Sequence, residues 1–264
     1  MGYSCGLTAI GRGKLPVEAP SAYETFGIPH LLTMAALLLG GAVMVGATRR
    51  WATLDQAKSI GAGIALFMLA QELFDRGYHV YLGDDFWGHV LPLQMCGASV
   101  FLTIALLLTR NYRIFQLLYF WGLGGAGVAI LTPDIQYPFP HVLNITYFTS
   151  HALIIVGVAY MMANFGYRPT LGSLGGTILF SNLYMAAMFP LNALLGTNFL
   201  FVSEKPPSLS LLDFMGPWPW YVLGMELVGI AVFCLLYAPY LVMDYFKASS
   251  VAPQAAEASG YGDD

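Results

Sequence analysis

Charged side chains are scarce in this sequence. Only 10% of its 264 residues are Asp, Glu, Lys or Arg, and 57% are hydrophobic; soluble domains carry about 25% charged residues. The formal net charge is −4 at pH 7, and no run of five basic residues occurs. This composition indicates an integral membrane protein and predicts no nucleic-acid partner.

Cysteines and familiar catalytic motifs are also few. The three cysteines, Cys5, Cys96 and Cys234, lie far apart and form no CxxC pair. No HExxH or HxxxH sequence occurs, and the one GxSxG match, GYSCG at 2–6, stands at the start of the chain with no predicted strand before it. The sequence therefore indicates neither a disulfide framework nor a zinc or serine hydrolase, and we expect no metal and no cofactor.

Seven stretches are apolar enough to cross a bilayer, which takes about 20 residues per helix. They predict an all-α, polytopic fold in which residues 29–245 form a seven-helix membrane domain. An N-terminal segment, 1–28, lacks the features of a cleaved signal peptide, and the polar tail 246–264 is expected to be disordered. The stretches cover 29–48, 59–82, 88–109, 112–132, 144–164, 170–195 and 218–243.

The distribution of Lys and Arg predicts the orientation, because cytoplasmic loops are enriched in these residues. Seven of them follow the odd-numbered spans or lie in the tail, against three on the other side. This favours an N-terminus outside and a cytoplasmic C-terminus. The two sets are Arg49, Arg50, Lys58, Arg110, Arg113, Arg168 and Lys247, and Arg12, Lys14 and Lys205.

With this orientation, the polar residues within the spans gather in the outer half of the bilayer. Ionisable residues at membrane depth are costly and usually face a cavity or each other. We therefore expect a polar cavity open to the outer side. Its candidate substrate-binding residues are His89, Gln94, Glu72, Arg76, His79, Asn192 and Glu226.

The second span carries four ionisable residues on one helical face. Glu72, Asp75, Arg76 and His79 have the spacing i, i+3, i+4 and i+7, so Glu72 can pair with Arg76 and Asp75 with His79. Two interpretations remain open. Arg76 could bind a phosphate group, for which a guanidinium is well suited, or the four residues could form an internally neutralised strut near the interface.

Cys96 is the best candidate for a reactive group. If residues 88–109 form one helix with Pro92 in its first turn, Cys96 lies about 10 Å deeper than His89, too far for both to bind one metal ion. His151 of the fifth span lies at the depth of Cys96. A lone buried cysteine is usually inert, but a thiol beside an imidazole is typical of nucleophilic catalysis.

The connection 196–220 is long and rich in aromatic residues. Its tryptophans, Trp218 and Trp220, could anchor the protein at the headgroup level. Long ordered loops also tend to carry function, so the same segment could be a lid over the outer cavity.

Several motifs resemble those of one known family, over roughly residues 91–221. They are LPLQMC at 91–96, YFWGLGGAGVAILTPDIQYPFPH at 119–141, FTSH at 148–151 and KPPSLSLLDFMGPWPWY at 205–221. Together they resemble the YwaF family of bacterial membrane proteins, which is similar to the animal transmembrane protein 164. The resemblance implies a seven-helix protein of the bacterial cytoplasmic (inner) membrane.

The animal relative is regarded as a phospholipid acyltransferase with a cysteine and a histidine in the membrane, which correspond here to Cys96 and His151. The resemblance thus implies an acyl-transfer enzyme acting on phospholipids and lysophospholipids. Apart from the resemblance, Asn192, Gln94 or a donor from the second span could stabilise the oxyanion. One alternative is a transporter or headgroup-binding protein without catalysis, in which Arg76 matters more than Cys96. Another is a structural or sensory bundle. The oligomeric state is not indicated.

Overall fold

The computed structural model describes residues 23–84, 86–135, 137–206 and 211–259. Within these residues, seven helical segments are long and apolar enough to cross a membrane, which confirms the prediction of an all-helical, multi-span protein. Most of the N-terminal segment, 1–22, lies outside the described residues. The segments are Ile28–Trp51, Leu54–Leu82, Phe86–Thr109, Tyr112–Leu131, Val142–Phe165, Leu171–Leu195 and Trp220–Phe246.

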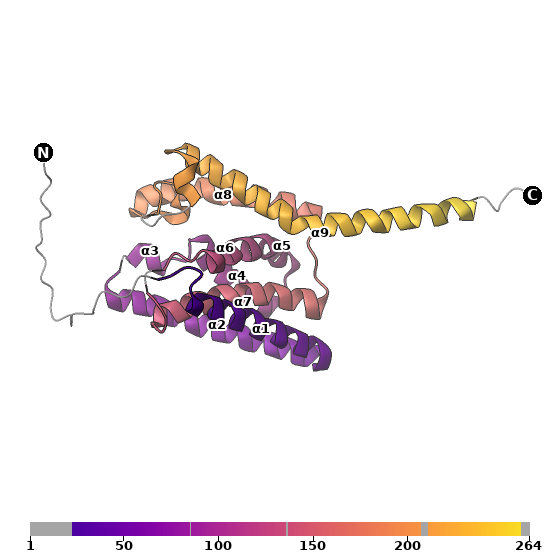
Figure 1. Cartoon of the computed structure of the whole chain (residues 1–264), viewed down its shortest axis with the longest axis horizontal. Coiled ribbons are helices and arrows are strands. Elements are labelled where there is room, and N and C mark those ends of the chain that lie inside the picture. The colour runs from indigo at the N-terminus through magenta and orange to yellow at the C-terminus, as the bar shows by residue number, and fades with distance from the viewer. Residues whose placement is uncertain (1–22, 85, 136, 207–210, 260–264) are drawn as a thin grey trace, which may run out of the picture.

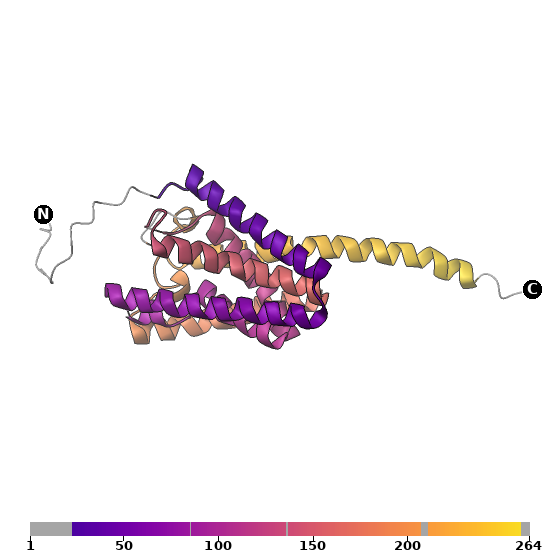
Figure 2. The same ribbon diagram turned by 90° about the horizontal axis from the view of Figure 1, so that it is seen from below.

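The helices form a central group with one helix on one side and a pair on the other. The central group contains α2 (Leu54–Leu82), α4 (Met95–Thr109), α5 (Tyr112–Trp121) and α7 (Val142–Phe165), which contact one another. Helix α1 (Ile28–Trp51) crosses α7 obliquely (Figure 2). Helices α8 (Leu171–Leu195) and α9 (Trp220–Ser259) lie together as a separate layer that joins the rest mainly through α5 and the turn after it (Figure 1).

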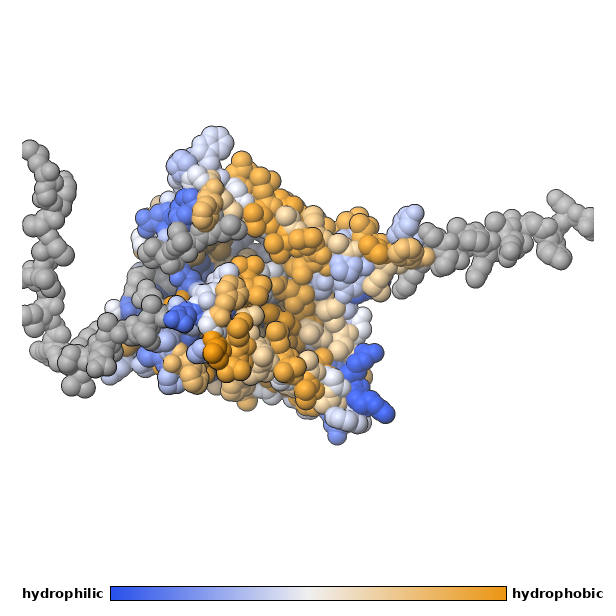
Figure 3. All heavy atoms as spheres, viewed as in Figure 1, coloured by the Kyte–Doolittle hydropathy of each residue, from blue (hydrophilic) through white to orange (hydrophobic). Residues whose placement is uncertain are grey.

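The outer surface of this bundle is apolar. Leucine, valine and phenylalanine side chains of α1, α8 and α9 are largely exposed, among them Val43, Leu183 and Leu235. Figure 3 shows an apolar band across the molecule, with hydrophilic residues toward its ends. Such a large apolar surface is unfavourable in water and favourable against lipid chains. The helices also satisfy their own backbone hydrogen bonds, as a segment inside a bilayer requires.

Two of the seven spans are not continuous α-helices. The third consists of α3 (Phe86–Val90), a break over 91–94, and α4. The prediction of one helix with Pro92 in its first turn is therefore wrong at this point. Proline lacks an N–H and collides with the carbonyl four residues earlier, so Pro92 ends α3 instead of beginning a helix.

The fourth span contains a turn of π-helix, η1 (Gly122–Ala126), between α5 and α6 (Gly127–Leu131). Its glycines lie against neighbouring helices. A Cβ atom added to Gly122 would lie 2.8 Å from Ile154 Cγ2, and one added to Gly125 would lie 2.5 Å from Met95 Cε. These small residues allow α4 and α7 to pack closely against the fourth span.

The backbone of α9 is helical to Ser259, and residues 260–264 lie outside the described part of the chain. The segment 247–259 contains several alanines, which favour a helix, and one proline, Pro253, which disfavours it. The expectation of a disordered tail stays a prediction.

The basic residues that predicted the orientation gather at one end of the bundle and tie its helices together there. Arg49 of α1 donates to the carbonyl of Ala163. The hydroxyl of Tyr112 donates to the carbonyl of Arg168, at 2.7 Å, and Arg168 pairs with Asp244 of α9, also at 2.7 Å. Basic side chains are thus concentrated at the end opposite the break at 91–94.

We predict that this basic end is cytoplasmic. Green fluorescent protein fused after Asp264 should fluoresce in cells, because it folds in the cytoplasm, and alkaline phosphatase fused at the same position should be inactive. Active phosphatase with a dark fluorescent fusion would reverse the orientation.

Close packing between α4 and α7 gives a second prediction. A Cβ at Gly157 would lie 2.5 Å from Cγ2 of Thr103, which is fully buried, whereas a Cβ at Gly175 would meet nothing within 4 Å. Gly157→Ala should therefore lower the free energy of unfolding in detergent by about 1–3 kcal/mol. The matched control Gly175→Ala should leave it unchanged or slightly higher. Equal thermal stability of the two variants would contradict this packing.

Candidate functional site

The site is built on a chain reversal after α2. Gly83 adopts the left-handed conformation (φ 77°), and its N–H donates to the carbonyl of Val80 at 3.1 Å. The N–H of Asp84 donates to the carbonyl of His79 at 3.2 Å. This pattern is a Schellman motif, which ends a helix and turns the chain back, and it places α3 beside the last turns of α2.

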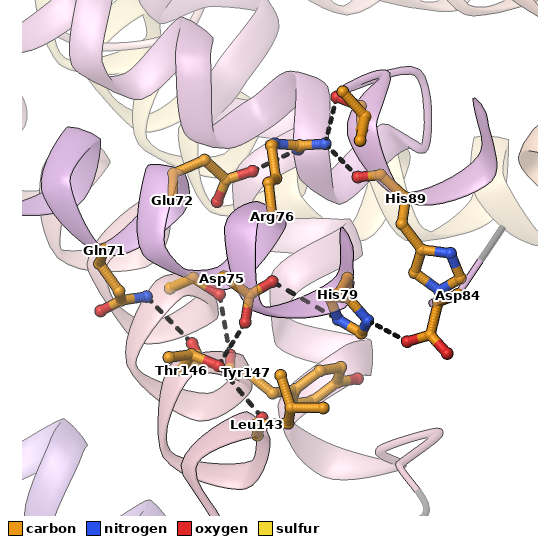
Figure 4. A network of polar contacts seen from close by, with 12 residues as sticks. Gln71, Glu72, Asp75, Arg76, His79, Asp84, His89, Leu143, Thr146 and Tyr147 are labelled. Atoms are coloured by element: carbon orange, nitrogen blue, oxygen red, sulfur yellow. Dashed lines mark hydrogen bonds and ion pairs between the residues drawn. The ribbon is translucent and has the colours of Figure 1, made fainter. Parts of the chain in front are cut away.

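Arg76 joins α2 to α3. Its Nη1 donates to the carbonyls of His89 (2.5 Å) and Val90 (2.8 Å), and its Nη2 donates to the carboxylate of Glu72 (Figure 4). The side chains of Arg76 and Glu72 are only 15% and 9% exposed, respectively. The predicted pairing of Glu72 with Arg76 is confirmed, and these contacts favour the strut interpretation, because the guanidinium neutralises the carbonyl end of α3. A phosphate-binding role for Arg76 stays a prediction.

The second predicted pair connects α2 to α7. His79 Nε2 lies 3.8 Å from Oδ2 of Asp75. The other carboxylate oxygen, Oδ1, accepts a hydrogen bond of 2.5 Å from the hydroxyl of Thr146 (Figure 4). Thr146 precedes His151 on α7, so the carboxylate of Asp75 contacts the helix that carries the predicted base.

Cys96 lies in the first turn of α4, not two turns inside a helix. Gln94 is the N-cap, and its carbonyl accepts the N–H of Ala98 at 2.9 Å. The N–H groups of Met95, Cys96 and Gly97 consequently have no acceptor within the helix and carry its partial positive charge. A thiolate at a helix N-terminus is stabilised by this charge. Cys96 is partly buried.

Arg76 adds to this environment through Gly97. A Cβ at Gly97 would lie 3.3 Å from Nη2 of Arg76. The guanidinium thus lies against the backbone of the residue that follows the thiol. His89 is on α3, across the break, so His89 and Cys96 do not lie on the one continuous helix that the sequence predicted.

His151 is buried on α7 with a defined hydrogen bond. Its Nδ1 lies 2.7 Å from the carbonyl oxygen of Tyr147. A carbonyl only accepts, so Nδ1 carries the proton, and Nε2 of the neutral ring keeps its lone pair. The ring centroids of Tyr147 and His151 lie 4.3 Å apart. Cys96 is on α4, which contacts α7.

The break itself is held by α8 and by the connection that follows it. The hydroxyl of Tyr184 donates to the carbonyl of Leu93 at 2.8 Å. The side-chain oxygen of Gln94 accepts the N–H of Leu200, in the 3₁₀ turn η2 (Phe199–Phe201), at 2.9 Å. Leu200 and Phe201 have φ of 59° and 52°, a strained conformation for bulky side chains. This part of the connection 196–220 therefore packs on the start of the proposed site, as a lid would.

Two predicted site residues have their polar groups engaged elsewhere. Asn192 donates to the carbonyl of Phe199 (3.0 Å) and accepts from the Phe199 N–H (2.8 Å), so it fixes the connection after α8. Glu226 accepts from Asn182 at 2.6 Å, between α9 and α8. The structure therefore favours backbone N–H groups of α4 over Asn192 as oxyanion donors. Both substrate-binding assignments stay predictions.

The structure also assembles a cluster that sequence reasoning missed. The ligand atoms of His79, Asp84 and His89 all lie within 4.8 Å of one another. We expected no metal site, since the cysteines show no metal-type spacing and no HExxH or HxxxH sequence occurs. The one available signal was Gly83 at the predicted end of the second span, which implies a chain reversal.

An apolar groove of about 430 Å³ runs between α1 and α7. Ala152, next to His151 in the chain, lines it together with side chains of α1. Its lining suits a lipid chain. The polar outer cavity expected from the sequence stays a prediction. The α1 residues include Met34, Leu37, Val45 and Arg49.

Comparisons with known proteins agree with the resemblance seen in the sequence. The model of the TMEM164 family matches residues 25–237, which extends well beyond the motifs at 91–221. An uncharacterized protein of Treponema pallidum (strain Nichols) is 27% identical over 223 residues, covering 83% of this chain and 90% of the relative. No solved structure matches the chain.

Removing the charge of Arg76 should destabilise the fold, because it leaves the buried Glu72 carboxylate and the carbonyls of α3 without a partner. We expect Arg76→Gln to lower the free energy of unfolding by about 3 kcal/mol. The double variant Glu72→Gln/Arg76→Gln should lose less than Arg76→Gln alone. Lys58→Ala, which breaks the exposed pair with Asp55, should change stability by less than about 1 kcal/mol. A small effect of Arg76→Gln would show that the α3 anchor is dispensable.

Proposed function

Since the chain belongs to the TMEM164 family, we propose that it is an integral membrane acyl-transfer enzyme acting on phospholipids and lysophospholipids. The observation that carries this proposal is the position of Cys96 in the first turn of α4, a helix that contacts α7, on which the buried His151 lies. The proposed nucleophile with its backbone donors and the proposed base therefore come from two neighbouring helices.

The environment of Cys96 supports a reactive thiol. The N-terminus of α4 places partial positive charge beside the residue, and positive charge favours the thiolate, which is the nucleophilic form. Cys234, by contrast, is exposed on α9 toward lipid and has no proposed role.

His151 serves as the base. With Nδ1 bonded to the Tyr147 carbonyl, the lone pair on Nε2 takes the thiol proton. The imidazolium that forms is stabilised by the carboxylate of Asp75, which contacts the same helix through Thr146. A carbonyl that orients a histidine and an acid that stabilises its charged form are the two supports that such bases require.

The reaction proceeds in two steps. The Cys96 thiolate attacks the ester carbonyl carbon of a donor phospholipid, and the N–H groups of Cys96 and Gly97 bind the oxyanion. The C–O bond then breaks, and the lysophospholipid oxygen leaves with the proton from His151, which gives a Cys96 thioester. In the second step His151 removes the proton of an acceptor lysophospholipid hydroxyl. This oxygen attacks the thioester carbonyl, and the thiolate is released.

A second candidate function is headgroup binding without catalysis. One observation favours it: Nε of Arg76 is buried and has no hydrogen-bond partner among the described residues, so one donor of the guanidinium is available. In that case Arg76 and Glu72 determine lipid binding, and Cys96 can be replaced without effect.

The purified protein should transfer acyl groups between phospholipid and lysophospholipid in detergent or vesicles. Cys96→Ser and His151→Ala should each reduce the rate by at least about 100-fold, in keeping with the loss of a nucleophile or general base. The matched control Cys234→Ser should retain the full rate. The products are measured by mass spectrometry with an isotope-labelled acyl donor.

A thioester intermediate provides an independent check. Acyl-enzyme should accumulate on Cys96 when acceptor is withheld, should be cleaved by hydroxylamine, and should be absent from Cys96→Ser. Folded Cys96→Ser protein with an unchanged transfer rate would refute the mechanism, and binding of phospholipid that depends on Arg76 alone would support the second candidate.

A further inference from the structure

The end of α2 and the short helix α3 bring two histidines and one aspartate together. The ligand atoms of His79, Asp84 and His89 lie within 4.8 Å of one another, and the imidazole rings of the two histidines are 4.5 Å apart between centroids. We propose that these three residues bind a divalent transition metal ion of the zinc type. The proposal does not depend on acyl transfer.

The donor set determines the class of metal. Two imidazole nitrogens and one carboxylate oxygen suit Zn²⁺, Co²⁺ or Ni²⁺, whereas Ca²⁺ and Mg²⁺ prefer oxygen ligands alone. In a tetrahedral zinc site with bonds of 2.0–2.1 Å, neighbouring ligand atoms lie about 3.3 Å apart. Rotation about the side-chain bonds closes the remaining distance, and it replaces the stacking of the two imidazole rings by convergence of their nitrogens.

The backbone that carries these ligands is fixed by other contacts. The Schellman motif at Gly83 holds Asp84 beside the backbone of His79. The side chain of Arg76 binds the carbonyl of His89 itself. The backbone segments that carry the three ligands are therefore held in place by these hydrogen bonds, and the side chains of His79 and Asp84 also contact each other at 2.8 Å, so binding needs rotation of side chains but little ordering of the backbone.

A metal-bound histidine usually donates its other ring N–H to a carboxylate or carbonyl, and Asp75 is placed to accept from His79 in this way. His79 Nδ1 lies 2.8 Å from Asp84, while Nε2 of the same ring faces Asp75 at 3.8 Å. When Nδ1 binds the metal with Asp84, Nε2–H donates to Asp75, whose other oxygen accepts the Thr146 hydroxyl. Such carboxylate–histidine–metal arrangements fix the ring orientation and strengthen metal binding.

The cluster is accessible from outside the protein, because His89 and Asp84 are exposed and His79 is half-buried. Three protein ligands leave a fourth position of a tetrahedral ion for water or for an anionic oxygen. A phosphate oxygen, from a lipid headgroup or from free phosphate, is the anionic ligand that such a position takes in this setting.

Cobalt binding provides the test. Purified full-length protein, stripped of metal with a chelator, is titrated with Co²⁺, and the visible absorption of tetrahedral cobalt is recorded. We expect one equivalent to bind and to be displaced by Zn²⁺ but not by excess Mg²⁺ or Ca²⁺. His79→Ala and His89→Ala should each weaken binding by at least 100-fold, and Asp75→Asn by about 10-fold.

Two matched controls make the outcome decisive. Cys96→Ser should bind like the unchanged protein, which excludes coordination by the thiol. His141→Asn should also bind normally, because His141 caps α7 through its hydrogen bond with the Leu143 N–H and asparagine can take over this role. Folding of each variant is checked by thermal unfolding, and Zn²⁺ should raise the melting temperature only when His79 and His89 are both present.

Absence of the cobalt spectrum from the unchanged protein would overturn the proposal, and so would unaltered binding by folded His89→Ala. Equal displacement by Mg²⁺ would also overturn it, since an oxygen-preferring site cannot depend on two imidazoles. To identify the fourth ligand, the cobalt spectrum is compared with inorganic phosphate added and with vesicles containing an anionic phospholipid. A change with either probe identifies the source of the anionic ligand, and no change with both would overturn the assignment of a phosphate oxygen.

Discussion

The guanidinium of Arg76 is the interaction on which this arrangement depends. It places one positive charge among the Glu72 carboxylate, two carbonyls at the end of α3 and the backbone at Gly97. Without it, the carbonyls exposed by the break at Pro92 would face a bilayer without partners, which costs several kcal/mol per group. The break in turn allows α4 to begin at Met95, and only a helix that begins there presents its free N–H groups around Cys96.

The membrane makes this placement more consequential than it would be in water. Ionisable residues are expensive at this depth, yet α2 carries four on one face. Each of them has an identified partner: Glu72 with Arg76, and Asp75 with His79 and Thr146. Because each of these charges has a partner, the polar groups near Cys96 and His151 can be retained without a large loss of folding free energy. The site then depends on keeping the paired side chains in their relative positions.

Much of the fold followed from the sequence, because bilayer thickness fixes helix length. The seven spans and the pairing of Glu72 with Arg76 depend only on hydropathy and helical periodicity, which are local. The break at 91–94 could not be predicted in the same way, because Pro92 is compatible with either a helix start or a helix end. Contacts from Arg76, Tyr184 and Leu200 accompany the second outcome. All three come from elsewhere in the chain.

The same limit applied to the site. Cys96 and His151 were predicted from residue type, depth and the family resemblance, and their pairing stays a prediction, whereas the closeness of Asp84 and His89 to His79 depends on the reversal at Gly83. For Asn192, the residue type suggested an oxyanion donor, but its amide satisfies the backbone of Phe199. Polar side chains near a chain reversal often serve the backbone first, and that demand becomes visible only when the loop is folded.

The contact between Met95 and the π-helix η1 has an evolutionary consequence. The end of the Met95 side chain occupies the space that a side chain at Gly125 would need, so the residue before the thiol is positioned by a residue about thirty places later in the chain. Among relatives, a larger residue at the position of Gly125 is compatible with the same backbone only if the position of Met95 becomes smaller. Positions 95 and 125 should therefore covary among relatives, because their combined size keeps the start of α4 in place.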